Sequence, residues 1–391
     1  MTTLLLAQDF PPVGGGIARF HGELARRYPP GELVVSTSQD PDAAEVDAEL
    51  RGAIIDRLPV NRRLTKTLPG LLLWARRATS LAREHHVRFV HCGNVRPAGY
   101  PTRWVHERLR VPYSIFLYGA DLLSEQHKIH SAFKRRTSKA IFGGAAVLIA
   151  ISGWTRDLAL AVLGELGLDR HGDRLRVVHL GTDPAHFRPG VDPAGIRERF
   201  KLENGKVRWL LTVARLEPHK GVDMVLRALP AIIAGAPDIR YAVAGKGPER
   251  ERLKKLAHKI GVADRVHFLG EVSERDLPAL YNLASVYVGA SRRAERLGVE
   301  GFGISLVEAS ACGLPVVAGK SGGIPDAVRE GETGFLIPPE DPEAIAAVVG
   351  RLLADASLAG RIGAAGRRAV ETYYNWDRVV RDLRAIEAEL S

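Results

Sequence analysis

Two cations stand five residues apart in the stretch VARLEPHKG. Arg215 and Lys220 follow an apolar run that is typical of a buried strand. A planar guanidinium and a flexible ammonium at the carboxyl end of a strand suit a diphosphate. A solvated surface loop would explain the same two residues, and His219 between them is expected at the surface rather than in catalysis.

Two carboxylates, Glu300 and Glu308, flank a glycine-containing stretch farther along the chain. Gly303 releases the backbone just before an expected helix at 303–312, whose N-terminus can then face an anion. Carboxylates accept hydrogen bonds from vicinal hydroxyls, which sugars and riboses both offer. Eight-residue spacing means little by itself, but together with the two cations it fits a sugar nucleotide.

Three consecutive glycines, Gly14 to Gly16, follow the first apolar run. Glycines between a strand and a helix let backbone N–H groups approach a phosphate. The stretch is not the G-x-G-x-x-G fingerprint of dinucleotide binding. A tight structural turn explains it equally well.

Short apolar runs alternate with helical patterns along the whole chain. Runs of four to eight apolar residues are typical of strands that are buried on both faces of a parallel sheet. The expected strands are 4–7, 33–36, 88–92, 113–117, 145–150, 208–214, 239–245, 266–270, 285–290, 314–319 and 334–338. The expected helices include 17–28, 68–86, 152–163, 221–234, 248–260, 303–312 and 341–354.

This alternation predicts an α/β protein with two Rossmann-like domains, each a doubly wound parallel sheet, facing a cleft. Turn residues near 184–207 place the boundary, which gives domains 1–190 and 191–374. The last segment, 375–391, contains an amphipathic helix with no strand after it. We expect it to pack back on the N-terminal domain.

Composition excludes several other classes of protein. The 391 residues are 46% hydrophobic and 26% charged, as in ordinary globular chains. Cys92 and Cys312 are too few for a disulfide scaffold. No apolar run approaches the ~20 residues of a membrane span, and the N-terminus lacks the basic region of a signal peptide. We therefore expect a cytoplasmic protein.

The net charge of +10 is uneven along the chain. Residues 1–190 hold 26 Lys and Arg against 18 Asp and Glu, and residues 191–391 hold 29 against 27. A basic N-terminal half indicates an anionic partner, either a phosphorylated acceptor or an anionic membrane, unless it is only a well-solvated arginine-rich surface. No motif supports nucleic-acid binding.

The ordered set of motifs resembles the retaining glycosyltransferases of family 4, which have the GT-B fold. The resemblance covers nearly the whole chain and is carried by PPVGGGIARFHGELARR, ISGWTRD, HLGTDPAHFRP, VARLEPHKGVDMVLRALP, VAGKGPER, the Glu300–Glu308 block and SGGIPDAVREGETGFLIPPEDPEAIA. It implies transfer of a sugar from a nucleoside-diphosphate sugar, GDP-mannose or a UDP-sugar, to a hydroxyl acceptor such as a lipid-linked or polysaccharide precursor. It implies no metal and no other cofactor.

The resemblance also assigns roles to matching residues. Arg215 and Lys220 would stabilise the leaving diphosphate, and Glu300 would bind hydroxyls of the donor sugar. Other donor-binding positions implied by the family are Gly15, Gly16, Glu271, Val272, Phe302, Gly303, Ile304, Ser305 and Glu308.

One position departs from the family pattern. Many relatives have a histidine at the end of the fourth N-terminal strand, where this chain has Tyr118 in the stretch FLYGAD. Tyrosine is neutral up to about pH 10. Tyr118 and Asp121 are therefore candidates for sharing the histidine's role.

The helix at 68–86 offers a clue to the acceptor. Its core stripe is expected to be Leu71, Trp74, Ala75, Ala78, Leu81 and Ala82. Leu72 and Leu73 then fall on the opposite side with Arg76 and Arg77, a pattern typical of peripheral contact with an anionic membrane. An ordinary arginine-rich helix is the alternative.

Two alternative functions remain open at this point. The same fold serves phosphorylases and sugar-nucleotide epimerases, and a chain of this kind could also bind a sugar nucleotide without turnover. Donor sugar, nucleotide, acceptor and linkage are not determined by the motifs.

Overall fold

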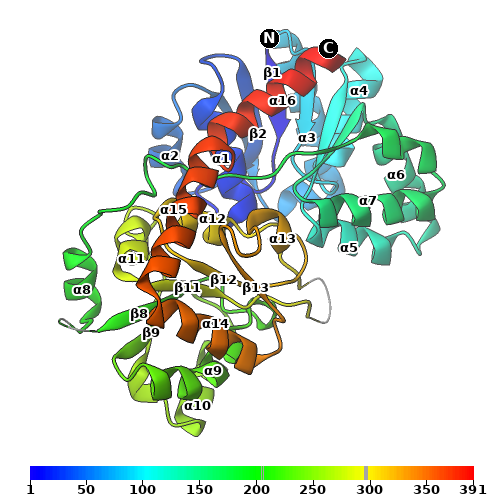
Figure 1. Cartoon of the computed structure of the whole chain (residues 1–391). Helices are drawn as coiled ribbons and strands as arrows, with labels where there is room; N and C mark the ends of the chain where they lie inside the picture. Colours follow the sequence, from blue (N-terminus) through cyan, green and yellow to red (C-terminus); the bar gives the residue numbers. More distant parts are fainter. Residues whose placement is uncertain (204, 206, 295–297) are drawn as a thin grey trace. The chain divides into compact units, whose positions relative to one another are not determined.

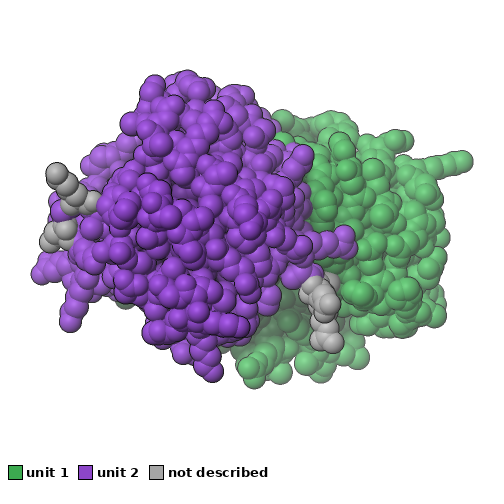
Figure 2. Space-filling model, turned by 60° about the horizontal axis from the view of Figure 1, so that its bottom comes forward, with its two compact units in different colours: residues 1–180, 376–391 green, residues 181–375 purple. Residues whose placement is uncertain are grey.

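The structure, a computed structural model, describes residues 1–203, 205, 207–294 and 298–391. The chain forms two compact units (Figure 2). The first contains residues 1–180 and 376–391, and the second contains residues 181–375. The chain therefore leaves the first unit ten residues before the expected boundary at 190, and its last helix belongs to the first unit.

Each unit is built on one parallel sheet. The first sheet has the order β3-β2-β1-β4-β5-β6-β7 and the second the order β10-β9-β8-β11-β12-β13. Every strand pair in both sheets is parallel. The strands are β1 (Thr3–Leu6), β2 (Leu33–Gln39), β3 (Ile54–Asn61), β4 (Phe89–Cys92), β5 (Tyr113–Leu117), β6 (Val147–Ala150), β7 (Leu175–Val177), β8 (Arg208–Val213), β9 (Ile239–Ala244), β10 (Val266–Gly270), β11 (Val286–Gly289), β12 (Val316–Gly319) and β13 (Gly334–Ile337).

Helices connect the strands and cover the sheets (Figure 1). In the first unit they are α1 (Gly16–Arg27), α2 (Ala43–Glu49), α3 (Leu68–Glu84), α4 (Gly99–Leu109), α5 (Ala120–Lys128), α6 (Ala132–Gly144), α7 (Gly153–Leu166) and α16 (Trp376–Leu390). In the second unit they are α8 (Ala194–Phe200), α9 (Val222–Gly235), α10 (Arg250–Lys259), α11 (Leu277–Leu283), α12 (Ile304–Ala311), α13 (Ile324–Ala327), α14 (Pro342–Ala354) and α15 (Ala356–Thr372).

The prediction of two doubly wound parallel sheets is confirmed, but it missed the two edge strands of the first sheet. β3 contains Pro59 and several half-exposed or exposed residues. Proline and polar residues are tolerated at a sheet edge, where only one side of the strand needs partners. β7 is three residues long. Neither strand has the apolar run that marks a strand buried on both faces.

Strand order fixes where ligands can bind. In each sheet the order reverses next to the first strand, between β1 and β4 and between β8 and β11. Ligands of doubly wound sheets bind at such a switch point, outside the carboxyl ends of the strands. The glycine stretch follows β1, and the two cations follow β8.

The C-terminal helix α16 packs on α1 within the first unit, where the Phe20 and Trp376 ring centroids are 6.0 Å apart (Figure 1). Its one fully buried carboxylate anchors it. Glu387 accepts hydrogen bonds from the Tyr28 hydroxyl at 2.7 Å and from His91 Nε2 at 2.8 Å. Burial raises the pKa of Glu387, but the hydrogen bonds from His91 and Tyr28 outweigh it and hold the pKa below the ordinary value.

This lowered pKa predicts a pH-dependent contribution to stability. Glu387→Gln removes the charge and keeps the shape, so it should lower the free energy of unfolding at pH 7 by about 1–3 kcal/mol. A lowered folded-state pKa stabilises the protein above the unfolded-state value and loses its effect as pH falls through the folded value. The difference between wild type and variant in urea unfolding should therefore shrink below pH 4.5. A difference that stays constant down to pH 3 would contradict this account.

Candidate active site

A pocket in the second unit opens at the switch point between β8 and β11. Its walls come from the end of β8, the end of β11 and the start of α12, and two charged side chains reach into it. The lining residues are Thr212, Val213, Ala214, Lys220, Tyr287, Gly289, Ser291, Glu300, Gly303, Ser305 and Leu306. Four of the sequence-predicted residues, Lys220, Glu300, Gly303 and Ser305, are thus brought together.

Lys220 and Glu300 form an ion pair across this pocket. Both side chains are mostly buried, although 80 residues of sequence separate them. Burial raises the pKa of Glu300, but the Lys220 charge and hydrogen bond outweigh it, with smaller help from His219 and Arg215, and the pKa lies below the ordinary value. The carboxylate is therefore ionised at neutral pH.

The amino end of α12 forms one wall of the pocket. The helix begins after Gly303, whose φ of 105° is in a region that side chains disfavour. The first-turn amides of Ile304 and Ser305 have no partner inside the helix, and the helix dipole adds partial positive charge there. An anion in the pocket would therefore meet Lys220 and a helix N-terminus together.

Glu308 lies one turn into α12 and is buried. Its Oε2 accepts a hydrogen bond of 2.7 Å from the Tyr281 hydroxyl. A second tyrosine, Tyr287 on β11, donates its hydroxyl proton to the Val213 carbonyl at 3.1 Å, and its oxygen lies 2.9 Å from Ser305 Oγ, which can donate to it. Sequence reasoning missed both tyrosines because their apolar neighbours mark them only as core residues.

The remaining predicted residues of this unit lie around the pocket. Arg215 is exposed and pairs with Glu217 at 3.0 Å. Glu271, on the loop after β10, is exposed and pairs with Lys246, and Val272 beside it is half-buried. Phe302 is buried, 6.1 Å from the Tyr374 ring. None of these four lines the pocket.

His219 differs from its expected surface position, because it is 7% exposed. Burial, followed by the neighbouring Lys220 charge, lowers its pKa below the ordinary value. Its segment must pack closely against the end of β11 for Lys220 to reach Glu300, and the tightness of that packing is not visible in the sequence.

In the first unit the glycine stretch follows β1 at the switch point, and β5 ends one strand beyond β4 in the same sheet. Gly15 has a φ of 120° and precedes α1, which begins at Gly16. Both glycines are exposed. Asp121, in the first turn of α5, accepts hydrogen bonds from the amides of Tyr118 and Leu122 through Oδ1, both at 3.0 Å.

The other oxygen of Asp121, Oδ2, is buried and has no hydrogen-bond partner among the described residues. Burial raises the pKa of this carboxyl to about 6, against the lowering effect of its backbone hydrogen bonds. A buried acceptor without a partner is costly for the fold. Asp121 Oδ2 is therefore a candidate to accept a hydrogen bond from a ligand hydroxyl.

The hydroxyl of Tyr118 is engaged inside the protein. His21 Nδ1 lies 2.6 Å from the Asp9 carbonyl oxygen and therefore carries the proton, which leaves Nε2 to accept from Tyr118 at 2.8 Å. Burial lowers the pKa of His21 to about 4, so the ring is neutral. Burial also raises the pKa of Tyr118 well above 10. The Tyr118 hydroxyl thus donates its one hydrogen bond to His21. Its oxygen can only accept further hydrogen bonds.

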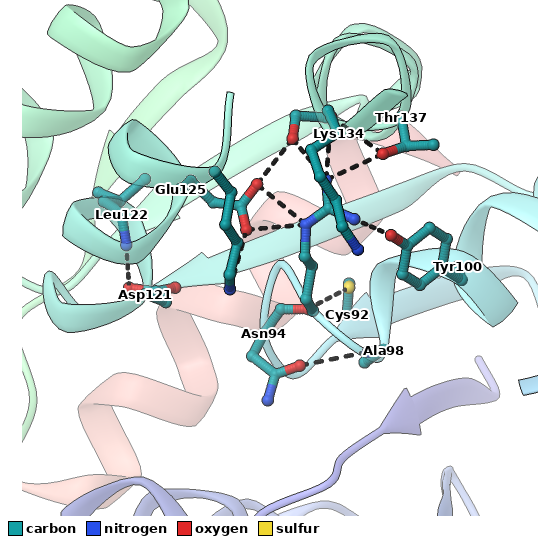
Figure 3. A network of polar contacts seen from close by, with 12 residues as sticks. Cys92, Asn94, Ala98, Tyr100, Asp121, Leu122, Glu125, Lys134 and Thr137 are labelled. Carbon is teal, nitrogen blue, oxygen red and sulfur yellow. Dashed lines mark hydrogen bonds and ion pairs between the residues drawn. The ribbon is translucent and has the colours of Figure 1, made fainter. Parts of the chain in front are cut away.

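A buried polar network fixes the start of α5 (Figure 3). The Arg96 guanidinium donates to Glu125 at 2.8 Å and 3.1 Å, and to hydroxyl and carbonyl groups at the start of α6. Ser138 donates to Glu125 at 2.7 Å. The loop after β4 is thereby tied to α5 and α6, and α5 carries Asp121.

The helix α3 exposes the two leucines singled out in the sequence. Leu72 and Leu73 are each 37% exposed, whereas Leu68 and Leu64, which were not singled out, reach 71% and 47%. Of the expected core stripe, Leu71 is only half-buried. Arg76 is exposed, but Arg77, whose side chain is 40% exposed, donates to Asp56 at 2.8 Å, so its charge is paired. Among the described residues, no helix is long and apolar enough to span a bilayer.

Within the described residues, no three or more His, Cys, Asp or Glu side chains form a group that could hold a metal ion.

Two family models match the chain and together span most of it. The model "Glycosyl transferases group 1" matches residues 196–369, and "Glycosyltransferase Family 4" matches residues 14–186. Among solved structures, Anabaena HepE in complex with UDP-glucose aligns over 100% of both chains with a TM-score of 0.79 and 21% identity. Sucrose-phosphate synthase from Thermosynechococcus elongatus aligns over 100% and 99% with a TM-score of 0.75 and 21% identity.

Curated relatives match over almost their entire length. A GDP-mannose-dependent alpha-(1-6)-phosphatidylinositol monomannoside mannosyltransferase of Mycobacterium tuberculosis is 32% identical over 97% of this chain and 96% of its own. The protein of the same name from Mycolicibacterium smegmatis is 34% identical over 95% and 94%. With the two parallel sheets and these matches together, the chain belongs to glycosyltransferase family 4 and has the GT-B fold.

Proposed function

We propose that this enzyme transfers mannose from GDP-mannose to a hydroxyl of a phosphatidylinositol-type lipid. The relatives that match end to end carry that activity in their names, and the pocket beside Lys220 and Glu300 offers what a sugar diphosphate needs. The observation that carries the proposal is the Lys220–Glu300 pair at the start of α12, where a cation, a carboxylate and free amides converge.

Each group has a proposed task. Lys220, Arg215 and the first turn of α12 neutralise the diphosphate and stabilise its charge as it leaves. When the donor binds, Lys220 exchanges its ion pair with Glu300 for one with the phosphate. Glu300 then accepts hydrogen bonds from hydroxyls of the donor sugar. Glu308 accepts from the ribose hydroxyls, and the chain around Glu271 and Val272 lies against the base.

The proposed transfer retains the anomeric configuration and needs no metal. The bond between the anomeric carbon and the phosphate oxygen breaks while a bond to the acceptor oxygen forms on the same face. The acceptor proton passes to a phosphate oxygen of the leaving diphosphate. In the first unit, Asp121 Oδ2, which has no partner among the described residues, is proposed to accept a hydrogen bond from a substrate hydroxyl.

Donor identity can be tested by thermal shift. A ligand that binds only the folded state raises Tm by mass action. GDP-mannose and GDP should raise Tm, whereas UDP-glucose, UDP-galactose, UDP-GlcNAc and ADP-glucose should not at the same concentrations. A shift with a UDP-sugar alone would contradict the proposed donor and leave the transferase family unchanged.

The role of Glu300 gives a second prediction. Glu300→Gln should lower kcat/KM for GDP-mannose, with phosphatidylinositol monomannoside vesicles as acceptor, by about 10²–10³-fold, as when one transition-state contact is lost. The free energy of unfolding should fall by no more than about 1–3 kcal/mol, because the amide still fills the site but no longer carries the charge that pairs with Lys220. Glu251→Gln, an exposed glutamate on α10, is the matched control and should change neither. Equal losses of stability and turnover would make Glu300 a structural residue.

We also propose that α3 brings the enzyme to an anionic membrane. Four large apolar side chains on α3 and the turn before it are exposed, and together they are the proposed membrane patch: Leu64, Leu68, Leu72 and Leu73. Arg63, Lys66 and Arg76 are exposed near them in the chain. Apolar side chains bordered by cations suit the interface of a bilayer that carries negative charge. Arg77 has no part in this proposal, because it pairs with Asp56.

Vesicle co-sedimentation tests the membrane contact. The double variant Leu68→Gln with Leu72→Gln should bind vesicles of phosphatidylcholine with phosphatidylinositol at least about tenfold more weakly, since each buried leucine contributes roughly 1 kcal/mol or more. Leu160→Gln, an exposed leucine on α7, is the control. Equal binding by all three proteins would rule out this patch as the contact.

A further inference from the structure

Lys220 stands on a segment that packs unusually closely on the end of β11. It ends a short 3-10 turn, Pro218–Lys220, and Gly221 follows with a φ of 67°. A Cβ on Gly221 would lie 1.8 Å from the Ala290 carbonyl oxygen. The position of Lys220 therefore depends on how this segment is held against the chain that leaves β11.

Arg292, two residues beyond Ala290, holds that segment at two points. Its amide donates to the carbonyl of His219 at 2.8 Å, just before Lys220. Its guanidinium donates through two nitrogens to both carboxylate oxygens of Asp223, at 3.0 Å and 3.1 Å, just after Lys220. Lys220 is thus bracketed by contacts to a single residue.

The side-chain pair is built to be rigid. Asp223 is in the first turn of α9 and is almost fully buried, and the Arg292 side chain is largely buried. Two parallel hydrogen bonds between a guanidinium and a carboxylate fix orientation as well as distance. Lysine would keep the charge but could not make the same two-pronged contact.

We infer that Arg292 is a positioning residue, which sets Lys220 against Glu300 by holding Asp223 and the His219 carbonyl. The expected effect on turnover rests on the proposed function, whereas the expected effect on the Lys220–Glu300 contact does not. Arg292 does not line the pocket and acts on it by holding Lys220 in place. Misplacing a charged group by about 1 Å can lower the rate on the order of 10²-fold. This role accounts for a buried ion pair that joins the start of α9 to the segment that leaves β11.

The first test is structural and needs no substrate. In crystal structures of Arg292→Lys and of Asp223→Asn, the contact between Lys220 Nζ and Glu300 should be lost. Arg208→Lys is the matched control, because Arg208 pairs with Asp238 in the same two-pronged manner at the starts of β8 and β9. It should leave the Lys220 contact intact. A preserved contact in both Arg292→Lys and Asp223→Asn would overturn the inference.

The second test is a double-mutant cycle on GDP-mannose turnover, with unfolding measured for each variant. Arg292→Lys should lower kcat about 10- to 100-fold with KM changed less than threefold, and Arg208→Lys should not. In the Lys220→Ala background, Arg292→Lys should have no further effect, because it acts through Lys220. If the double variant instead lost kcat by the product of the two single-variant factors, the inference would be overturned. Unchanged turnover in Lys220→Ala would instead refute the proposed role of Lys220, while the structural test would still decide the positioning role.

Discussion

The contact between Lys220 and Glu300 joins two distant segments of the second unit across its pocket. It joins the loops that follow β8 and β11, two strands that are neighbours only because the sheet order reverses there. Two charges that are mostly removed from water are tolerable only when their geometry is well held. The close approach at Gly221, the amide of Arg292 and the start of α12 can all be understood as parts of that constraint.

The first unit uses buried charge differently. Glu387 and Glu125 are carboxylates with almost no exposure, and each is surrounded by donors that tie helices to the sheet or to one another. Asp121 contrasts with both, since its Oδ2 is buried and has no hydrogen-bond partner in the described part of the chain. Buried polar groups are normally satisfied, so an exception at the carboxyl edge of a sheet points to a ligand.

His21 and Tyr118 form a hydrogen-bonded pair at the one position where the chain departs from the family's sequence pattern. Tyr118 stands where the family resemblance implies a histidine, and α1 supplies a buried neutral imidazole that accepts a hydrogen bond from its hydroxyl. The hydrogen bond to the Asp9 carbonyl fixes which ring nitrogen is free to accept. The polar group at this position is therefore Tyr118 together with His21.

The sequence by itself determined the fold class, because central strands of a parallel sheet are buried on both faces and must be apolar throughout. It also singled out Lys220, Glu300 and Gly303, because these residues carry charge or backbone freedom at expected loop positions, and the family resemblance added Ser305. It could not determine β3, whose edge position allows Pro59 and polar residues, nor the burial of His219. Arg292, Asp223, Tyr281 and His21 became visible only in three dimensions, since their roles come from contacts between segments distant in sequence. Local pattern reports which face of an element is buried, and only tertiary structure decides which side chains meet.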